Sequence, residues 1–268
     1  MSFLLTIDAG NTNTVFGVHD GPELRAHWRL TTRREQTADE YGVLVRNLFA
    51  GSGVDPGRIQ GVALASVVPP LTPVLIELSR EYLGQDPLVV EPGVKTGLPI
   101  LYEPPGDVGA DRIVNGVAAL AAYGAPVVVV DFGTATTFDV ITARGEYAGG
   151  VICPGVGISA DALFQRAARL PRVDVRNPGR VIGRSTVASI QSGLYFGYAA
   201  MVEGIIARIR AELGEPARVV ATGGLAATLA ADVPSIEAVD PVLTLTGLRL
   251  IWERNRHDAP PRREREGD

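Results

Sequence analysis

Two short polar segments of the chain carry the same order of residue types. The first is residues 8–14, Asp-Ala-Gly-Asn-Thr-Asn-Thr, and the second is residues 131–137, Asp-Phe-Gly-Thr-Ala-Thr-Thr. Each segment lies between two apolar runs that are typical of buried strands. Each therefore predicts a turn between two strands, with an aspartate where the first strand ends.

The residue types in these turns suit the binding of phosphate groups. Glycine lets the backbone come close to a ligand, and a tight turn directs N–H groups at oxyanions. Threonine and asparagine add donors, while aspartate can hold a metal ion or its water shell. One Asp-Gly or Asn-Thr turn alone is ordinary hairpin chemistry. Two copies, one in each half of the chain, favour two phosphate-binding turns.

The elements that must hold these turns occur in the same order in both halves. The first half predicts strands over 3–8, 14–18 and 24–30, a helix over 37–49, a strand over 59–68, a helix over 71–83, a strand over 88–90 and a helix over 111–123. The second predicts strands over 126–131, 135–142 and 145–152, helices over 158–169 and 187–213, a strand over 217–221, a short helix, a short strand and a last helix over 241–253. The first three strands of each half form an antiparallel meander, and right-handed crossovers follow. The repeat predicts a duplicated α/β architecture with a nucleotide between the halves.

Two stretches lack this periodicity. Residues 91–108 are rich in proline and glycine, and a loop of that length in a compact domain tends to carry function. Residues 254–268 are charged and contain proline, so we expect them to be disordered.

Composition excludes several classes of protein. Of 268 residues, 46% are hydrophobic and 21% charged, as in an ordinary globular chain, and the net charge of −5 disfavours binding to nucleic acid. The single cysteine, Cys153, rules out an intrachain disulfide framework and a multi-cysteine metal site. The longest uncharged run, 113–130, is interrupted by Asn115, Gly124 and Pro126, which favours a helix plus a strand over a membrane span. With no signal peptide at the start, we expect a cytoplasmic protein without a membrane partner.

The arrangement resembles the acetate and sugar kinase/Hsc70/actin superfamily. Residues 8–14 resemble its phosphate-1 loop, 131–137 its phosphate-2 loop, and 221–225 its adenosine motif. The resemblance implies a duplicated ribonuclease H-like (actin-like ATPase) fold, with two βββαβαβα-type domains and the active site in the cleft between them. We expect the N-terminal domain at 1–115, the C-terminal domain at 116–253 and the charged tail at 254–268.

Within that superfamily the chain is most similar to type III pantothenate kinases. Six blocks carry the match, in order: 8–12, 109–112 (Gly-Ala-Asp-Arg), 131–137, 149–155 (Gly-Gly-Val-Ile-Cys-Pro-Gly), 183–186 (Gly-Arg-Ser-Thr) and 192–193 (Ser-Gly). The Gly-Ala-Asp-Arg block is weak alone, but the ordered set over about residues 3 to 250 is specific. The resemblance implies ATP-dependent phosphorylation of pantothenate at its primary hydroxyl, which gives 4′-phosphopantothenate and opens coenzyme A biosynthesis.

Asp111 is the residue we expect to act as the base. A carboxylate at a loop-to-helix junction can face a cleft, although the helix dipole also favours an ordinary first-turn aspartate there. The family motif implies that Asp111 accepts the proton of the hydroxyl. Arg112 offers a planar fork of donors to a carboxylate or amide of the substrate, and the alternative is a surface ion pair. The full substrate-binding set that the resemblance implies is Tyr102, Gly109, Ala110, Asp111, Arg112 and Thr186.

The resemblance also implies partners and cofactors. Thr186 would reach the active site of a neighbouring subunit, so we expect a homodimer. Asp8 would steer Mg²⁺ through water, and Asp131 would hold a monovalent cation, K⁺ or NH₄⁺. The residues expected to bind ATP are Asp8, Ala9, Gly10, Asn11, Thr12, Asn13, Thr14, Val15, Gly133, Thr134, Gly223 and Gly224.

Two rival interpretations stay open. A kinase of the same fold could act on another small alcohol such as a sugar, although sugar-kinase substrate motifs are missing and the Gly-Ala-Asp-Arg block counts against it. A regulatory factor could keep the fold as a nucleotide-binding module. The presence of Asp8, Asp111 and Asp131 together favours catalysis, because a binder needs no base. Residues 93–96, Gly-Val-Lys-Thr, superficially resemble a P-loop but lack the glycine directly before the lysine and the earlier glycine of that motif.

Overall fold

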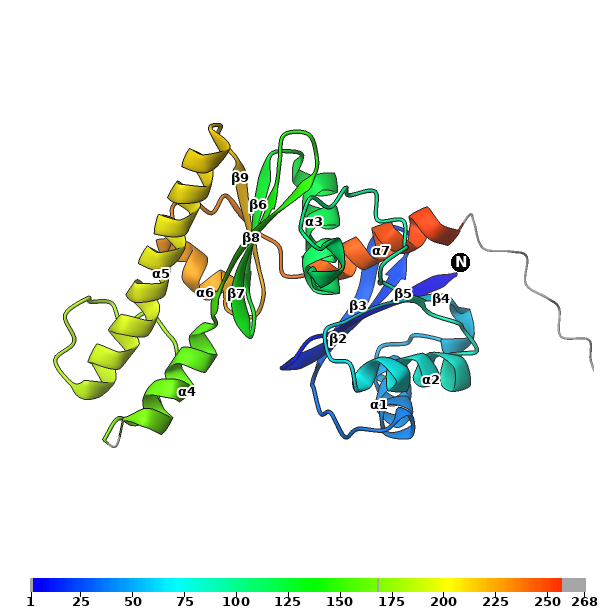
Figure 1. Cartoon of the computed structure of the whole chain (residues 1–268). Helices are drawn as coiled ribbons and strands as arrows, with labels where there is room; N and C mark the ends of the chain where they lie inside the picture. Colours follow the sequence, from blue (N-terminus) through cyan, green and yellow to red (C-terminus); the bar gives the residue numbers. More distant parts are fainter. Residues whose placement is uncertain (1, 168, 257–268) are drawn as a thin grey trace, which may run out of the picture. The chain divides into compact units, whose positions relative to one another are not determined.

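The computed structural model describes residues 2–167 and 169–256, which form two five-stranded mixed sheets with helices (Figure 1). The contacts divide the chain into two compact units. Unit 1 runs to Gly97 and resumes at Leu245, and unit 2 is Leu98–Thr244.

The sheet of unit 1 has the strand order β3-β2-β1-β4-β5. Strands β1, β2 and β3 pair antiparallel, while β4 joins β1 and β5 joins β4 in parallel. The elements are β1 (Phe3–Ala9), β2 (Asn13–Asp20), β3 (Glu23–Thr31), α1 (Ala38–Gly51), the 3₁₀ turn η1 (Pro56–Arg58), β4 (Ile59–Ser66), α2 (Leu71–Leu83), β5 (Leu88–Val89) and α7 (Leu243–Asn255), whose first two residues are counted with unit 2.

Local sequence explains these elements. The central strand β1 is almost wholly buried and apolar, whereas the edge strand β3 alternates between exposed and half-buried side chains. The predicted cap of α1 is present: the Glu40 N–H donates to Thr37 Oγ1 (3.3 Å), and the Thr37 N–H donates to Glu40 Oε2 (2.8 Å). Helix α2 ends at Gly84, which has a φ of 63° that suits glycine.

The sheet of unit 2 has the order β10-β9-β6-β7-β8. Counted along the chain from the first strand of each sheet, both units have the order third-second-first-fourth-fifth, so the predicted duplication is confirmed. The elements are η2 (Pro105–Asp107), α3 (Ala110–Tyr123), β6 (Val127–Phe132), β7 (Ala135–Ile141), β8 (Tyr147–Pro154), α4 (Val156–Arg166), α5 (Thr186–Leu213), β9 (Arg218–Thr222), α6 (Ala226–Leu229), η3 (Ala230–Asp232) and β10 (Ala238–Val239).

The units begin and end at other residues than the expected 1–115 and 116–253. Helix α3 follows the sheet of unit 1 in sequence but packs on β6 and β7 of unit 2. Helix α7 follows the sheet of unit 2 but packs on unit 1, where Leu245 lies over Gly17 and Trp252 over Gly61. Helical periodicity gives the apolar face of a helix but not the sheet that it covers.

The expected tail begins two residues too early. Asn255 is the last residue of α7, and the Arg254 guanidinium donates to the carbonyl of Thr96. Residues 257–268 lie outside the described part of the chain.

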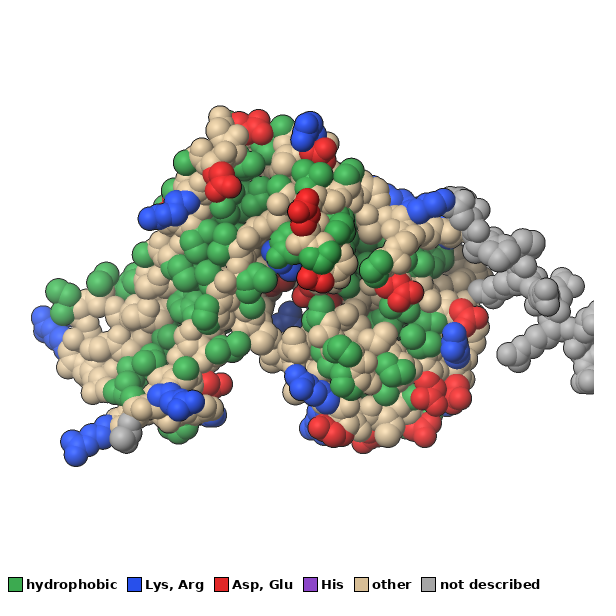
Figure 2. All heavy atoms as spheres, viewed as in Figure 1, with side chains coloured by type: hydrophobic (Ala, Val, Ile, Leu, Met, Phe, Trp, Pro, Cys, Tyr) green, Lys and Arg blue, Asp and Glu red, His purple; other side chains and the backbone are tan. Residues whose placement is uncertain are grey.

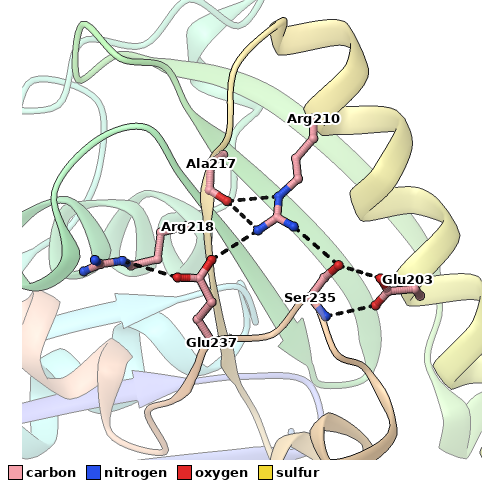
Figure 3. A network of polar contacts seen from close by, with 6 residues as sticks. All are labelled: Glu203, Arg210, Ala217, Arg218, Ser235 and Glu237. Atoms are coloured by element: carbon pink, nitrogen blue, oxygen red, sulfur yellow. Dashed lines mark hydrogen bonds and ion pairs between the residues drawn. The ribbon is translucent and has the colours of Figure 1, made fainter.

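A polar network in unit 2 links α5 to the residues at the start of β9 and just before β10 (Figure 3). Arg210, in the last turn of α5, donates to the carbonyl of Ala217 just before β9 (2.7 and 3.1 Å) and to Glu237 beside β10 (3.1 Å). Glu203, two turns earlier on α5, accepts from the hydroxyl (2.6 Å) and the N–H (3.1 Å) of Ser235. The network ties α5 to the parallel edge of the sheet.

No helix among residues 2–167 and 169–256 is long and apolar enough to cross a membrane.

Candidate functional site

The turn between β1 and β2 is braced from the third strand of unit 1. The Gly10 N–H donates to the Asn13 carbonyl (3.0 Å) and closes the turn. Thr32, just after β3, donates its hydroxyl to the Gly10 carbonyl (2.7 Å) and its N–H to the Thr12 carbonyl (3.0 Å). The shape of the turn is therefore fixed by the sheet, while the side chains of Asn11 and Thr12 are exposed.

The other predicted ATP residues of unit 1 differ in exposure. Asp8 is half-buried at the end of β1 and pairs with Val15 across the ladder. Ala9 and Thr14 are buried, and Thr14 Oγ1 lies 2.9 Å from Thr32 Oγ1. These two side chains serve the sheet, so a ligand can meet only the backbone there.

In unit 2 the structure brings two predicted ATP segments together. β6 pairs in parallel with β9, so Asp131 lies beside Thr222, and Gly223 follows directly. A Cβ on Gly223, which has a φ of 92°, would collide with Asp131 Oδ1. Gly133 also faces that carboxylate, since its Cβ would lie 3.3 Å from Oδ1. The glycines therefore leave room for the carboxylate and for a ligand close to it.

The exposed turn of unit 2 is also packed from the start of α4. Gly133 and Thr134 are exposed, and a Cβ on Gly155 would collide with the Thr134 carbonyl. Gly155 is the last residue of the Gly-Gly-Val-Ile-Cys-Pro-Gly block, and this close approach explains why that position is a glycine.

Asn115 is a functional candidate that the sequence prediction missed. It is buried on α3, and its Nδ2 donates to Asp131 Oδ2 (3.1 Å) while its Oδ1 accepts from Thr244 Oγ1 (2.7 Å). A single polar residue inside an apolar helical run, one turn after Asp111, was the available signal.

Asp111 lies in the first turn of α3, directly after Gly109 and Ala110. Its Oδ1 accepts from the Arg112 N–H (2.8 Å). Burial raises the pKa of Asp111, and the Arg112 N–H and guanidinium offset that rise only in part. A half-buried carboxylate with a raised pKa is suited to accept a proton.

Arg112 forms a buried ion pair rather than the surface pair that we considered. Its Nε donates to Asp139 Oδ1 (2.6 Å), with side-chain exposures of 9% and 0%. Asp139 also accepts from the Tyr147 hydroxyl (2.7 Å) and the Thr137 hydroxyl (3.3 Å). Burial raises the pKa of Asp139 to about 6, and the charge of Arg112 and the hydrogen bonds from Tyr147 and Arg112 offset part of that rise.

Tyr102 and Arg112 meet the same short segment of β8. A Cβ on Gly149 (φ 112°) would lie 3.2 Å from the Tyr102 ring, and a Cβ on Gly150 would lie 3.2 Å from Arg112 Nη2. The segment before Tyr102 is held to β8 by Tyr147, whose N–H donates to the Pro99 carbonyl (2.8 Å). Each of these two predicted substrate residues therefore lies against one of two consecutive glycines of β8.

Thr186 is exposed at the first residue of α5. Helix α5 starts there because Ser185 caps it, accepting from the Ala188 N–H (3.2 Å).

Similarity to known proteins decides the family. The family model described as type III pantothenate kinase matches residues 4–208. The chain belongs to the type III pantothenate kinase family. A type III pantothenate kinase from Moorella thermoacetica is 58% identical over 252 residues, covering 94% of this chain and 99% of that protein. The resemblance predicted from the motifs is thus confirmed.

Solved structures confirm the fold of this pantothenate kinase family member. A Baf family protein from Campylobacter jejuni superposes with a TM-score of 0.60 at 20% identity, covering 94% of this chain and 99% of that one. An inorganic polyphosphate/ATP-glucomannokinase from Arthrobacter sp. strain KM gives a TM-score of 0.51 at 16% identity, covering 95% and 100%. The duplicated ribonuclease H-like fold is therefore shown.

Proposed function

We propose that this chain transfers the γ-phosphoryl group of ATP to the primary hydroxyl of pantothenate. The product is 4′-phosphopantothenate, so the reaction is the first step of coenzyme A biosynthesis. The observation that carries the proposal is the 58% identity to a type III pantothenate kinase over 94% of the chain. The grouping of acid, base and donor residues on α3, β6 and β7 supports it.

Asp111 is the proposed base. Phosphoryl transfer has a loose transition state, so the protein mainly positions groups and offsets charge, but the attacking hydroxyl must still lose its proton. Burial brings the pKa of Asp111 closer to neutral pH. A general base is most effective when its pKa lies near the pH at which the enzyme works.

The acceptor is the proposed ligand of the neighbouring residues. Asp139 occupies the Nε of Arg112, so the Nη2 of the guanidinium is left to donate to the carboxylate of pantothenate. Tyr102 packs on Gly149 beside it, and Gly109 and Ala110 bring backbone groups at the start of α3.

The phosphates of ATP are the proposed ligands of residues 8–15, 133–134 and 223–224. Exposed Asn11, Thr12 and Thr134 offer side-chain donors, and the turns offer backbone N–H groups. Groups of three or more His, Cys, Asp or Glu side chains that could hold a metal ion do not occur in the described residues.

Two single carboxylates fit the proposed cations. Asp8 suits Mg²⁺, which binds through one or two carboxylates and keeps much of its water, and which neutralises charge on the phosphates. Asp131, half-buried and fixed by Asn115, offers oxygen ligands to K⁺ or NH₄⁺.

We also propose a homodimer in the cytoplasm, in which Thr186 reaches the active site of the neighbouring subunit. Hydrophobic side chains gather over α4 and α5 (Figure 2), and exposed apolar patches often mark protein interfaces. The large apolar residues that are exposed near Thr186, on α4, or on the segment between α4 and α5 are Ile158, Leu163, Phe164, Val181, Ile182 and Val187.

The test is an ADP-release assay with Mg²⁺ and potassium, using pantothenate, glucose and N-acetylglucosamine as acceptors, with product masses measured. We expect turnover with pantothenate and a product heavier by one phosphate. Turnover with a hexose alone would favour the sugar-kinase alternative. ATP binding without turnover on any acceptor would favour the regulatory one.

A further inference from the structure

Among the described residues, the Arg112 guanidinium forms its hydrogen bond through Nε. Its Nε donates to Asp139 Oδ1, whereas its Nη2 is buried and has no hydrogen-bond partner among the described residues. A guanidinium donor that is buried and unpaired costs free energy, so such a group usually has a ligand or a function.

The unpaired Nη2 lies where β8 has no side chains. Gly150 would place a Cβ 3.2 Å from Nη2, and the Tyr102 ring lies against the neighbouring Gly149. A larger residue than glycine at 150 would also collide with the Phe138 carbonyl. The unpaired donor therefore lies beside Gly150, next in sequence to the glycine that Tyr102 packs against.

Asp139 is positioned by a second set of donors. It is fully buried in β7, and the Tyr147 hydroxyl shares its Oδ1 with Arg112, while the Thr137 hydroxyl reaches Oδ2. The Tyr147 ring also lies near the guanidinium, 5.8 Å from Arg112 Cζ to the ring centroid. These contacts hold the Nε edge of the Arg112 guanidinium against Asp139.

We propose that Asp139 and Tyr147 are positioning residues that fix Arg112 so that its Nη2 donates to the carboxylate of pantothenate. The proposal rests on the proposed function. It assigns these residues to acceptor recognition and to neither ATP binding nor the chemical step.

The experiment compares Asp139→Asn and Tyr147→Phe with the unmodified chain. Pantothenate and pantothenol, its analogue with an alcohol in place of the carboxylate, serve as alternative acceptors. We expect the KM for pantothenate to rise by about ten-fold in Asp139→Asn and about three-fold in Tyr147→Phe. The KM for pantothenol, the KM for ATP and kcat should stay within about two-fold, because they do not depend on the Arg112–carboxylate bond.

Tyr195→Phe is the matched control. Tyr195 is a buried tyrosine of the same unit whose hydroxyl donates to Asp232 (2.5 Å) and to the Thr228 carbonyl (3.0 Å). Losing that Tyr–Asp bond should alter none of these constants. Tyr147→Phe keeps the buried ring in place, so it still tests the proposal if Asp139→Asn does not fold.

The outcomes distinguish failure of the positioning role from failure of the proposed function. Absence of pantothenate phosphorylation by the unmodified chain would refute the proposed function before any variant is made. Given normal turnover, an equal rise of both acceptor KM values, or no rise at all, would overturn the positioning role. A chain that takes pantothenate and pantothenol equally well would overturn the assigned Arg112–carboxylate bond.

Discussion

Removing Asn115 should destabilise unit 2 by a predictable amount. The Asn115→Ala change deletes a donor to the Asp131 carboxylate (3.1 Å) and an acceptor for the Thr244 hydroxyl (2.7 Å). A hydrogen bond to a charged group contributes about 1.5–3 kcal/mol and a neutral one about 0.5–1.5 kcal/mol. Because Asp131 is only half-buried, the lower part of the combined range applies, about 2–3 kcal/mol.

Thermal unfolding measures this loss. For a domain of this size each kcal/mol corresponds to roughly 2–4 °C, so the Tm of Asn115→Ala should fall by roughly 4–12 °C. Thr244→Val removes only the second bond and should cost about 1 kcal/mol. Since that bond is already absent in Asn115→Ala, the double variant should be no less stable than Asn115→Ala alone.

The double-mutant cycle makes the reasoning refutable. A coupling free energy of about 1 kcal/mol is expected between Asn115 and Thr244. Fully additive costs would mean that the two side chains do not act through one another, and an unchanged Tm in Asn115→Ala would mean that the bridge contributes nothing. In Asn115→Ala the potassium concentration for half-maximal activity should also rise, because Asp131 loses the Asn115 amide that orients it.

Three other changes test separate parts of the molecule. Asp111→Asn should lower kcat by about 10²–10⁴-fold in the ADP-release assay, and near-normal kcat would contradict the role as base. Replacing potassium by sodium should lower activity if Asp131 holds the cation; equal rates in both salts would count against that site. Burial, aided by Arg249, lowers the pKa of His19 to about 4. The folded state therefore binds the proton less well than the unfolded state, and stability is lost as pH falls from about 6.5 towards 4. His19→Gln should remove about 2 kcal/mol of the loss seen between pH 7 and pH 5 in urea unfolding; an identical pH dependence in both proteins would refute it.

The sequence predicted the strands and the antiparallel meander that opens each half, because both depend on local patterns. Apolar runs bounded by Gly, Pro and Asn gave the strands, and the repeated order of elements gave the same strand order in both sheets. The capping box at Thr37 and Glu40 was also predictable, since all its atoms lie within one turn. Small differences at element ends, such as α4 beginning at Val156 rather than 158, follow from cap geometry that residue types specify only loosely.

The motif blocks predicted Asp111 and Arg112 but not the residues that hold them. Asp139 and Tyr147 lie in strands and resemble ordinary sheet residues, and their relation to Arg112 spans more than 25 residues of sequence. A charged side chain in the apolar run that ends at Ile141 was the one available sign, because a carboxylate is almost never fully buried without a partner. The sequence could not name that partner.

The placement of α3 explains why these residues form a site at all. Its position in the chain, directly after β5, suggested that it completes the first half, as the expected boundary at 115 implied. Because α3 instead packs on β6 and β7, one face of it brings Asn115 to Asp131 and Arg112 to Asp139. The two turns are alike in sequence, yet the turn of unit 1 is braced by Thr32 from its own sheet, and the Asp131 carboxylate in unit 2 is bound by a side chain of α3. Because α3 packs on the sheet of unit 2, the turn of unit 2 has an acid, Asp111, and an arginine, Arg112, on the helix beside it.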